Sequence, residues 1–196
     1  MKYTVEVTKR FTKWYKEGTE INHREDGPAI EWTNGTKHWY QNGVLHRVDG
    51  PAIDSIAIGG TKEWWQNGIR HREGGPAIEG HNGDKHWYLN GLRHREDGPA
   101  IESAAGDKLW YKNGKCHRID GPACEYSDGH KKWYVFGIQH RTDGPAIEYS
   151  NGYKRWFIND VQIHCKNNEE FLRATSTSCE GKVVEIDGKK YKLIEV

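Results

Sequence analysis

The sequence predicts an all-β tandem-repeat protein, an elongated and twisted array of antiparallel β-hairpins with short caps. The string His-Arg-x-Asp-Gly-Pro-Ala occurs six times, and only Gly74 departs from it at the Asp position. The copies are 23 or 25 residues apart and begin at His23, His46, His71, His94, His117 and His140. An aromatic pair and turn dipeptides recur with the same period. Such self-similarity is typical of stacked repeat architectures.

Turn dipeptides divide each repeat into short strand-forming segments. A first set, such as Asn34-Gly35 and Asn82-Gly83, separates an Ala-Ile-Glu segment from a Lys-x-Trp-Tyr segment. A second set, such as Asn42-Gly43 and Asn90-Gly91, follows the aromatic pair. Asn-Gly between short apolar runs predicts a hairpin, because type I′ turns need positive φ at both central residues. Asp-Gly-Pro-Ala supplies a third bend, since proline fixes φ and cannot donate to a β-ladder.

The aromatic pair indicates which face of each strand is packed. Its Trp is constant between copies, whereas the residue before it changes freely. Because neighbouring strand residues point to opposite faces, we expect the Trp on the packed face and its two neighbours on the other. The structural tryptophans are Trp39, Trp64, Trp87, Trp110 and Trp133. The second face, called the aromatic face, is the candidate exposed binding surface and carries Tyr40, Trp65, Tyr88, Tyr111, Tyr134, His38, His86 and Lys132.

The repeated arginine has two interpretations. Each unit supplies its own carboxylates, which favours Arg47, Arg95 and Arg118 as structural partners of the repeated Asp and of the acidic residue that ends the segment. Bidentate bonds to such a carboxylate would hold the bend in place. The alternative is recognition of a phosphate or nucleotide by the arginine together with an adjacent aromatic ring.

The repeated histidines do not predict a metal site. If each unit contributes two strands to one sheet, equivalent histidines lie about 10 Å apart. That is too far for two copies to share a zinc ion, which needs nitrogens at about 2.0–2.1 Å. A closed β-solenoid is the alternative architecture, and it would stack the copies at about 4.8 Å and permit a histidine ladder.

Enzyme activity is not predicted. The reactive side chains recur with the repeat, and no P-loop, dinucleotide-binding or zinc-hydrolase motif is present. We therefore expect no catalytic residues and no cofactor. The four cysteines form no Cys-x-x-Cys pair and are expected to be free thiols.

The composition of the chain disfavours nucleic-acid duplexes and membranes as partners. The chain has 29 Lys and Arg against 28 Asp and Glu, a net charge of +1 that disfavours duplex nucleic acid. It has no run of 18 apolar residues and no signal-peptide core at its N-terminus, so we expect a cytoplasmic protein that does not associate with membranes. An exposed terminal strand could pair with a second copy, which makes a homodimer a further option.

The chain divides into three segments. Residues 1–22 contain an N-terminal strand and a partial repeat marked by Trp14-Tyr15. Residues 23–160 form the six-unit hairpin array, which ends where the spacing slips after Trp156. Residues 161–196 are expected to form a small α+β cap.

The C-terminal cap is predicted to contain one helix and one hairpin. The segment 168–173 is expected to be helical, with Asn167 or Asn168 as its N-cap. Two strand-like runs flank Asp187-Gly188 and predict the hairpin. A cap is needed because a repeat at the end of an array has one neighbour fewer to pack against.

The period and segments such as residues 39–46, Trp-Tyr-Gln-Asn-Gly-Val-Leu-His, resemble MORN repeats, whose units carry an aromatic residue, a glycine turn and often a following histidine. The resemblance covers roughly residues 10–160. Arg-x-Asp-Gly-Pro-Ala replaces the usual Gly-x-Gly after the histidine, and this variant is similar to repeat proteins of large phages and giant viruses. The resemblance implies an elongated antiparallel sheet that serves as a protein-binding scaffold, whereas lipid binding is not carried over.

The expected function is a non-enzymatic protein-binding scaffold. The resemblance implies a phage accessory protein that binds or inhibits a host defence factor in the host cytoplasm. The alternative is a sponge that sequesters a nucleotide or another small anionic ligand. Co-purification separates them: a stoichiometric protein partner supports the first, and a nucleotide released on denaturation supports the second.

Overall fold

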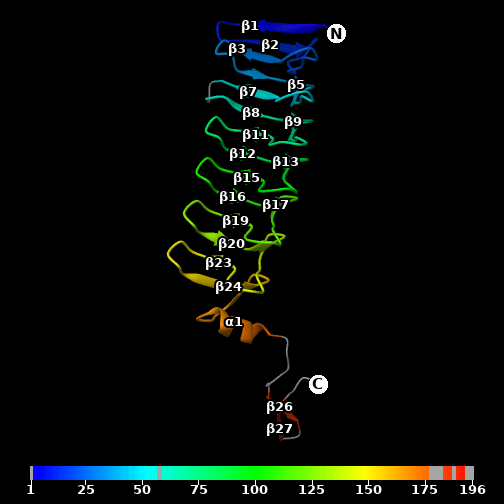
Figure 1. The fold of residues 1–196 in the computed structure, drawn as a ribbon. Coiled ribbons are helices and arrows are strands. Elements are labelled where there is room, and N and C mark those ends of the chain that lie inside the picture. The colour runs from blue at the N-terminus through cyan, green and yellow to red at the C-terminus, as the bar shows by residue number, and fades with distance from the viewer. Residues whose placement is uncertain (1, 57–58, 177–182, 187–188, 193–196) are drawn as a thin grey trace.

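The computed structural model describes residues 2–56, 59–176, 183–186 and 189–192, and it shows a long β-hairpin array (Figure 1). Within those residues one sheet has 15 strands, and its neighbours are antiparallel and follow chain order. These strands are β1 (Tyr3–Val7), β2 (Phe11–Lys16), β3 (Ile30–Trp32), β4 (Lys37–His38), β7 (Ile53–Ser55), β8 (Thr61–Glu63), β11 (Ile78–Glu79), β12 (Lys85–His86), β15 (Ile101–Glu102), β16 (Lys108–Leu109), β19 (Cys124–Glu125), β20 (Lys131–Lys132), β23 (Ile147–Glu148), β24 (Lys154–Ile158) and β25 (Val161–Ile163).

Each interior unit contributes its first hairpin to this long sheet and folds its second hairpin into a separate two-stranded sheet. The second hairpins are β5 (Tyr40–Gln41) with β6 (Val44–Leu45), β9 (Trp65–Gln66) with β10 (Ile69–Arg70), β13 (Tyr88–Leu89) with β14 (Leu92–Arg93), β17 (Tyr111–Lys112) with β18 (Lys115–Cys116), and β21 (Tyr134–Val135) with β22 (Ile138–Gln139). Two strands per unit in the long sheet make the fold a hairpin array and not a solenoid with one strand per unit.

The two sets of turn dipeptides form different turns. In the second set Asn42 and Gly43 have φ of 49° and 81°, the pair of positive values expected of a type I′ turn. In the first set only the glycine is positive, with Gly35 at 89°. The Gly35 N–H donates to the Trp32 carbonyl, and the Trp32 N–H donates to the Thr36 carbonyl. This is a type I turn followed by a left-handed glycine, so the type I′ prediction was wrong for this set.

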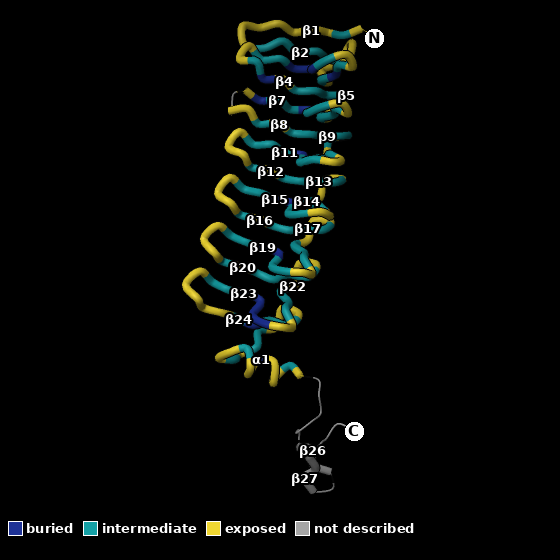
Figure 2. The backbone as a smooth tube through the Cα atoms, in the orientation of Figure 1, coloured by how far each residue is buried: buried dark blue, intermediate teal, exposed yellow. Residues whose placement is uncertain are grey.

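The most buried column of the array is alanine and not tryptophan. The last residue of each repeated motif has an exposed fraction of 0%, namely Ala29, Ala52, Ala77, Ala100, Ala123 and Ala146. Its carbonyl accepts a hydrogen bond from the preceding Trp, as in Trp87 N–H to Ala100 at 2.8 Å. The interior tryptophans Trp39, Trp64, Trp87, Trp110 and Trp133 are intermediate in burial. Figure 2 shows that most of the strands of the array are intermediate and that its turns are exposed. The interior tryptophans are therefore less buried than the alanine column, which forms the innermost part of the core.

A helix closes the C-terminal end of the array. Helix α1 (Asn168–Thr175) has Asn167 as its N-cap, whose side chain accepts the Glu170 N–H, so the predicted helix and cap are confirmed. Phe171 is fully buried and its ring lies 6.5 Å from that of Trp156. Strands β26 (Val183–Ile186) and β27 (Lys189–Lys192) pair antiparallel, while Asp187-Gly188 lie outside the described residues. No helix in the described part of the chain is long and apolar enough to cross a membrane.

Candidate functional site

The repeated arginine is held by its own bend, the seven residues His-Arg-x-Asp-Gly-Pro-Ala. Arg95 Nε donates to Asp97 at 2.9 Å, and its Nη1 donates to the Pro99 carbonyl at 3.2 Å and to Glu102 at 2.8 Å. The guanidinium carbon lies 4.0 Å from the centre of the Trp87 ring. The expected pairing with both acids is therefore present, but the guanidinium is shared between two carboxylates and is not bidentate on one.

The other bends hold their arginine in a similar way, except that the bend of Arg72 has Gly74 in place of the Asp and Arg72 donates to the Pro76 carbonyl and to Glu79. Arg47 donates to Asp49 and to the Pro51 carbonyl, and Arg118 donates to Asp120 and Glu125. Each arginine of a bend stacks on a tryptophan at 3.7 to 4.1 Å, as Arg72 does on Trp64 and Arg118 on Trp110. The arginine also explains why the motif has glycine before its proline. A Cβ on Gly98 would lie 2.9 Å from the Arg95 guanidinium carbon, too close for the two groups to fit.

In each Arg–Asp pair of the bends, the carboxylate faces solvent and the guanidinium is largely buried. The Asp97 side chain is 83% exposed and that of Arg95 is 21% exposed. The hydrogen bond from Arg95 holds the pKa of Asp97 below its usual value of 3.8. Since Asp26, Asp49, Asp120 and Asp143 have pKa values lowered in the same way by their arginines, the row of bends presents ionised carboxylates to solvent.

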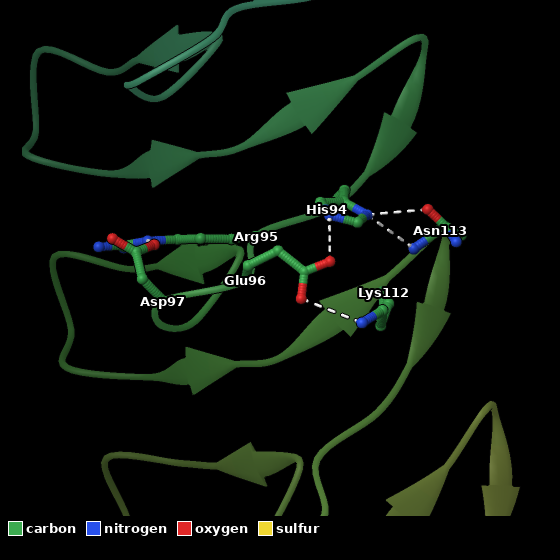
Figure 3. A network of polar contacts seen from close by, with 6 residues as sticks. All are labelled: His94, Arg95, Glu96, Asp97, Lys112 and Asn113. Atoms are coloured by element: carbon green, nitrogen blue, oxygen red, sulfur yellow. Dashed lines mark hydrogen bonds and ion pairs between the residues drawn. The ribbon is translucent and has the colours of Figure 1, made fainter.

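The repeated histidine links the bend to the second turn of its own unit. His94 Nδ1 accepts the backbone N–H of Asn113 in that turn. Its Nε2 lies 3.1 Å from Glu96, and Lys112 donates to the other oxygen of that carboxylate (Figure 3). The same Nδ1 bond recurs in all six copies: His23, His46, His71, His94, His117 and His140. The histidines therefore hold each bend to the second turn of its unit.

Stability is expected to fall under mildly acidic conditions. Burial is the main cause that lowers the pKa values of His38, His86 and His117 from 6.5. The unfolded chain then binds protons more readily, so stability is complete above about pH 6.5 and is lost as the pH falls through the folded-state pKa values. Scanning calorimetry should show a melting temperature that decreases between about pH 7.5 and about pH 5.5. A constant melting temperature there, with loss only below about pH 4, would assign the acid sensitivity to the aspartates alone.

A row of clefts lies between successive bends. One has a volume of 550 Å³ and is bordered by Arg95 to Pro99 of one bend, by Trp110, and by His117 to Asp120 of the next bend. Three further clefts have volumes of 560, 710 and 490 Å³ and contain Trp39, Trp64 and Trp87 at the same place. Because Trp lines each cleft, the residue assigned as purely structural also contributes to a candidate binding surface.

The rims of these clefts carry the variable residue of the bend, the x of His-Arg-x-Asp. Its occupants are Glu25, Val48, Glu73, Glu96, Ile119 and Thr142. Val48 is 74% exposed and Ile119 is 85% exposed. The sequence reasoning missed these residues. Their signal was a position that changes within an otherwise constant motif, next to proline and glycine that fix the backbone.

The aromatic face is half-buried and not exposed. Strand alternation correctly placed the residue before each Trp on the same side as the aromatic residue after it. Glu63 and Trp65 flank Trp64, and the Glu63 carboxylate accepts hydrogen bonds from Trp65 Nε1 at 3.0 Å and from Arg70 Nε at 3.1 Å. The variable residue before Trp also lies between two isoleucines of the neighbouring strands. His86, for example, is the cross-strand partner of Ile78 on one side and of Ile101 on the other. All eight residues of the candidate exposed face are intermediate in burial: Tyr40, Trp65, Tyr88, Tyr111, Tyr134, His38, His86 and Lys132.

No protein-family model matches the chain, and no curated protein matches it. Among the described residues, no group of three or more His, Cys, Asp or Glu side chains is arranged to hold a metal ion. The candidate site is therefore defined by geometry alone, as the row of clefts between bends with their tryptophans, exposed carboxylates and variable rims.

Proposed function

We propose that the protein is a non-enzymatic scaffold that binds an extended polypeptide along its row of clefts. One observation carries the proposal: clefts with the same architecture recur between successive bends, each with a Trp between two bends. A ligand that repeats along its own length can enter several such clefts at once. Binding in several clefts raises affinity without requiring a deep pocket in any single unit.

The pitch of the clefts favours a polyproline II segment. Successive units are two strands apart in the long sheet, which corresponds to about 10 Å. A polyproline II helix rises about 3.1 Å per residue with three residues per turn, so side chains on one of its faces recur about every 9.3 Å. In an extended β-strand the side chains return to the same face at every second residue, about 6.6 Å apart, so a strand matches this pitch less well. Grooves lined with aromatic residues are also a common way to bind such helices.

The charge of the clefts favours basic anchors on that segment. The exposed groups at the bends include the ionised carboxylates of Asp97 and Asp120, while the guanidinium groups of Arg95 and Arg118 are occupied by their own bends. We therefore propose Lys or Arg at every third position of the ligand. The resemblance to repeats of large phages leads us to propose a host protein, including a defence factor, as the source of the segment. Sequestration of a nucleotide takes second place, because the arginines that would bind phosphate are already paired.

The binding proposal is tested with a fluorescein-labelled peptide of four Pro-Pro-Arg triplets, measured by fluorescence anisotropy. We expect saturable binding that weakens with salt, because the carboxylates are exposed to solvent. A peptide of the same composition with its arginines gathered at one end should bind at least about tenfold more weakly, a loss of about 1.4 kcal/mol. Equal binding of the two peptides would contradict the match between ligand repeat and cleft pitch.

Matched variants locate the binding to the rims. Val48→Lys, Glu73→Lys and Ile119→Lys together raise the net charge by four at exposed rim positions and should abolish binding with little change in melting temperature. The control variant Glu17→Lys, Ala105→Lys and Ser150→Lys adds the same charge at exposed positions outside the clefts. It should retain most of the affinity. If both variants lose binding equally, the attraction is due to overall charge and the cleft proposal fails.

A further inference from the structure

Two cysteines of successive units meet on the aromatic face. Cys116 in β18 and Cys124 in β19 have their sulfur atoms 3.3 Å apart. At the equivalent positions the other units carry Leu45, Arg70, Arg93 or Gln139 in place of Cys116, and isoleucine in place of Cys124. The two cysteines therefore lie in contact across the junction of two successive units.

We propose that Cys116 and Cys124 form a reversible disulfide that clips the second hairpin of one unit to strand β19 of the next unit in the long sheet. Disulfide sulfurs are about 2.05 Å apart, so closing the bond requires an approach of roughly 1.3 Å, within reach of small side-chain rotations. The two strands that carry the thiols belong to different sheets, and the backbone between them turns through one bend. The closed loop contains His117 and Arg118, which border one of the clefts.

The surroundings divide the roles of the two thiols. Cys124 is 4% exposed, and the hydrogen bond from Cys116 lowers its pKa. Lys132 is its cross-strand neighbour and places a positive charge beside it. The same contact raises the pKa of Cys116, which is the less buried of the two residues. Cys116 is thus the sulfur that a small oxidant reaches, and Cys124 is the sulfur that resolves the intermediate.

The reaction balances with a small-molecule disulfide as the oxidant. As the Cys116 sulfur attacks that disulfide, it passes its proton across the 3.3 Å contact to the Cys124 thiolate, forms a mixed disulfide and releases one small thiolate, which takes up a proton from water. Cys124 then attacks the Cys116 sulfur, the bond to the small molecule breaks, and a second small thiol leaves with the second proton. Two protein thiols are oxidised and one small disulfide is reduced. A reducing thiol reverses both steps.

The test uses the full chain with Cys165→Ser and Cys179→Ser, so that only the two thiols in contact remain. Equilibration with oxidised and reduced glutathione should yield a species that has lost two hydrogen atoms, and peptide mapping should locate the bond between Cys116 and Cys124. The melting temperature should rise by about 5 °C on oxidation, because the cross-link restricts the unfolded chain. Accumulation of glutathione adducts without the internal bond would overturn the proposal.

A second variant checks that the two residues act as a pair. Adding Cys124→Ser should stop the reaction at a glutathione adduct on Cys116, with no rise in melting temperature on oxidation. Wild-type protein should map to the same bond between Cys116 and Cys124. A bond that maps to Cys165 or Cys179 in the wild type would contradict the assignment.

Discussion

Replacing Ala100 with leucine is expected to lower the free energy of unfolding by about 2 to 3 kcal/mol, because overpacking a filled site forces neighbouring groups apart. Ala100 has an exposed fraction of 0%, and its carbonyl accepts the Trp87 N–H at 2.8 Å. Three added carbon atoms have no free volume to enter, so the backbone between the bend and β15 must move. For a chain of this size the melting temperature should fall by about 4 to 12 °C in a calorimetric scan.

Ala105 provides the matched control. It lies in an exposed turn of the same unit, so Ala105→Leu adds the same atoms where solvent can be displaced. We expect a change within about 0.5 kcal/mol, as for other surface substitutions. If both variants lost equal stability, the alanine column would not be the packed core of the array.

The consequences of Ala100→Leu should extend beyond its own unit. Bonds between units join neighbours at several points, such as Trp87 N–H to the Ala100 carbonyl and Gly114 N–H to the Arg93 carbonyl. Repeat arrays of this kind depend on nearest-neighbour contacts for their stability. In the variant, backbone amides should therefore exchange faster than in the wild type in the units on both sides of Ala100. The exchange rate should change least near the capped end at Phe171.

Local sequence predicted the strands because their signals are local. Gly43 and Gly35 both occupy left-handed conformations that glycine adopts without strain, so the dipeptides marked hairpins even where the turn type was wrong. The core was missed for the opposite reason. Alanine has little apolar surface of its own, and Ala100 is buried where its bend stacks on the preceding unit, whose Trp87 N–H donates to the Ala100 carbonyl. That stacking is tertiary, and no single unit contains its signal.

The candidate site could be predicted in part. Period-two alternation placed Glu63 and Trp65 on one face, and they do contact each other. How far that face is exposed depends on the angle at which a second hairpin folds against the long sheet, which the sequence pattern does not encode. The clefts depend on two successive bends, so residues such as Ile119 gain their position only when the units are assembled.

Replacing Arg95 with alanine is expected to have the second large effect, a loss of about 3 kcal/mol in the free energy of unfolding. Its bond to Glu102 is charge-assisted, and bonds of this kind contribute about 1.5 to 3 kcal/mol, towards the lower end here because Glu102 is about a third exposed. Stacking of the guanidinium on Trp87 adds about 0.5 to 2 kcal/mol. Denaturant unfolding monitored by tryptophan fluorescence measures the loss.

Arg173 supplies the control for this prediction. It pairs with Glu169 across one turn of α1, and both side chains are exposed, so Arg173→Ala should cost about 0.3 to 0.5 kcal/mol. A double-mutant cycle of Arg95→Ala with Trp87→Leu then isolates the stacking contribution. A coupling free energy near zero would mean that Arg95 stabilises the bend through its hydrogen bonds alone. A coupling of about 1 kcal/mol or more would show that the constant Arg and Trp of the repeat act as one unit, because each is held in place by the other.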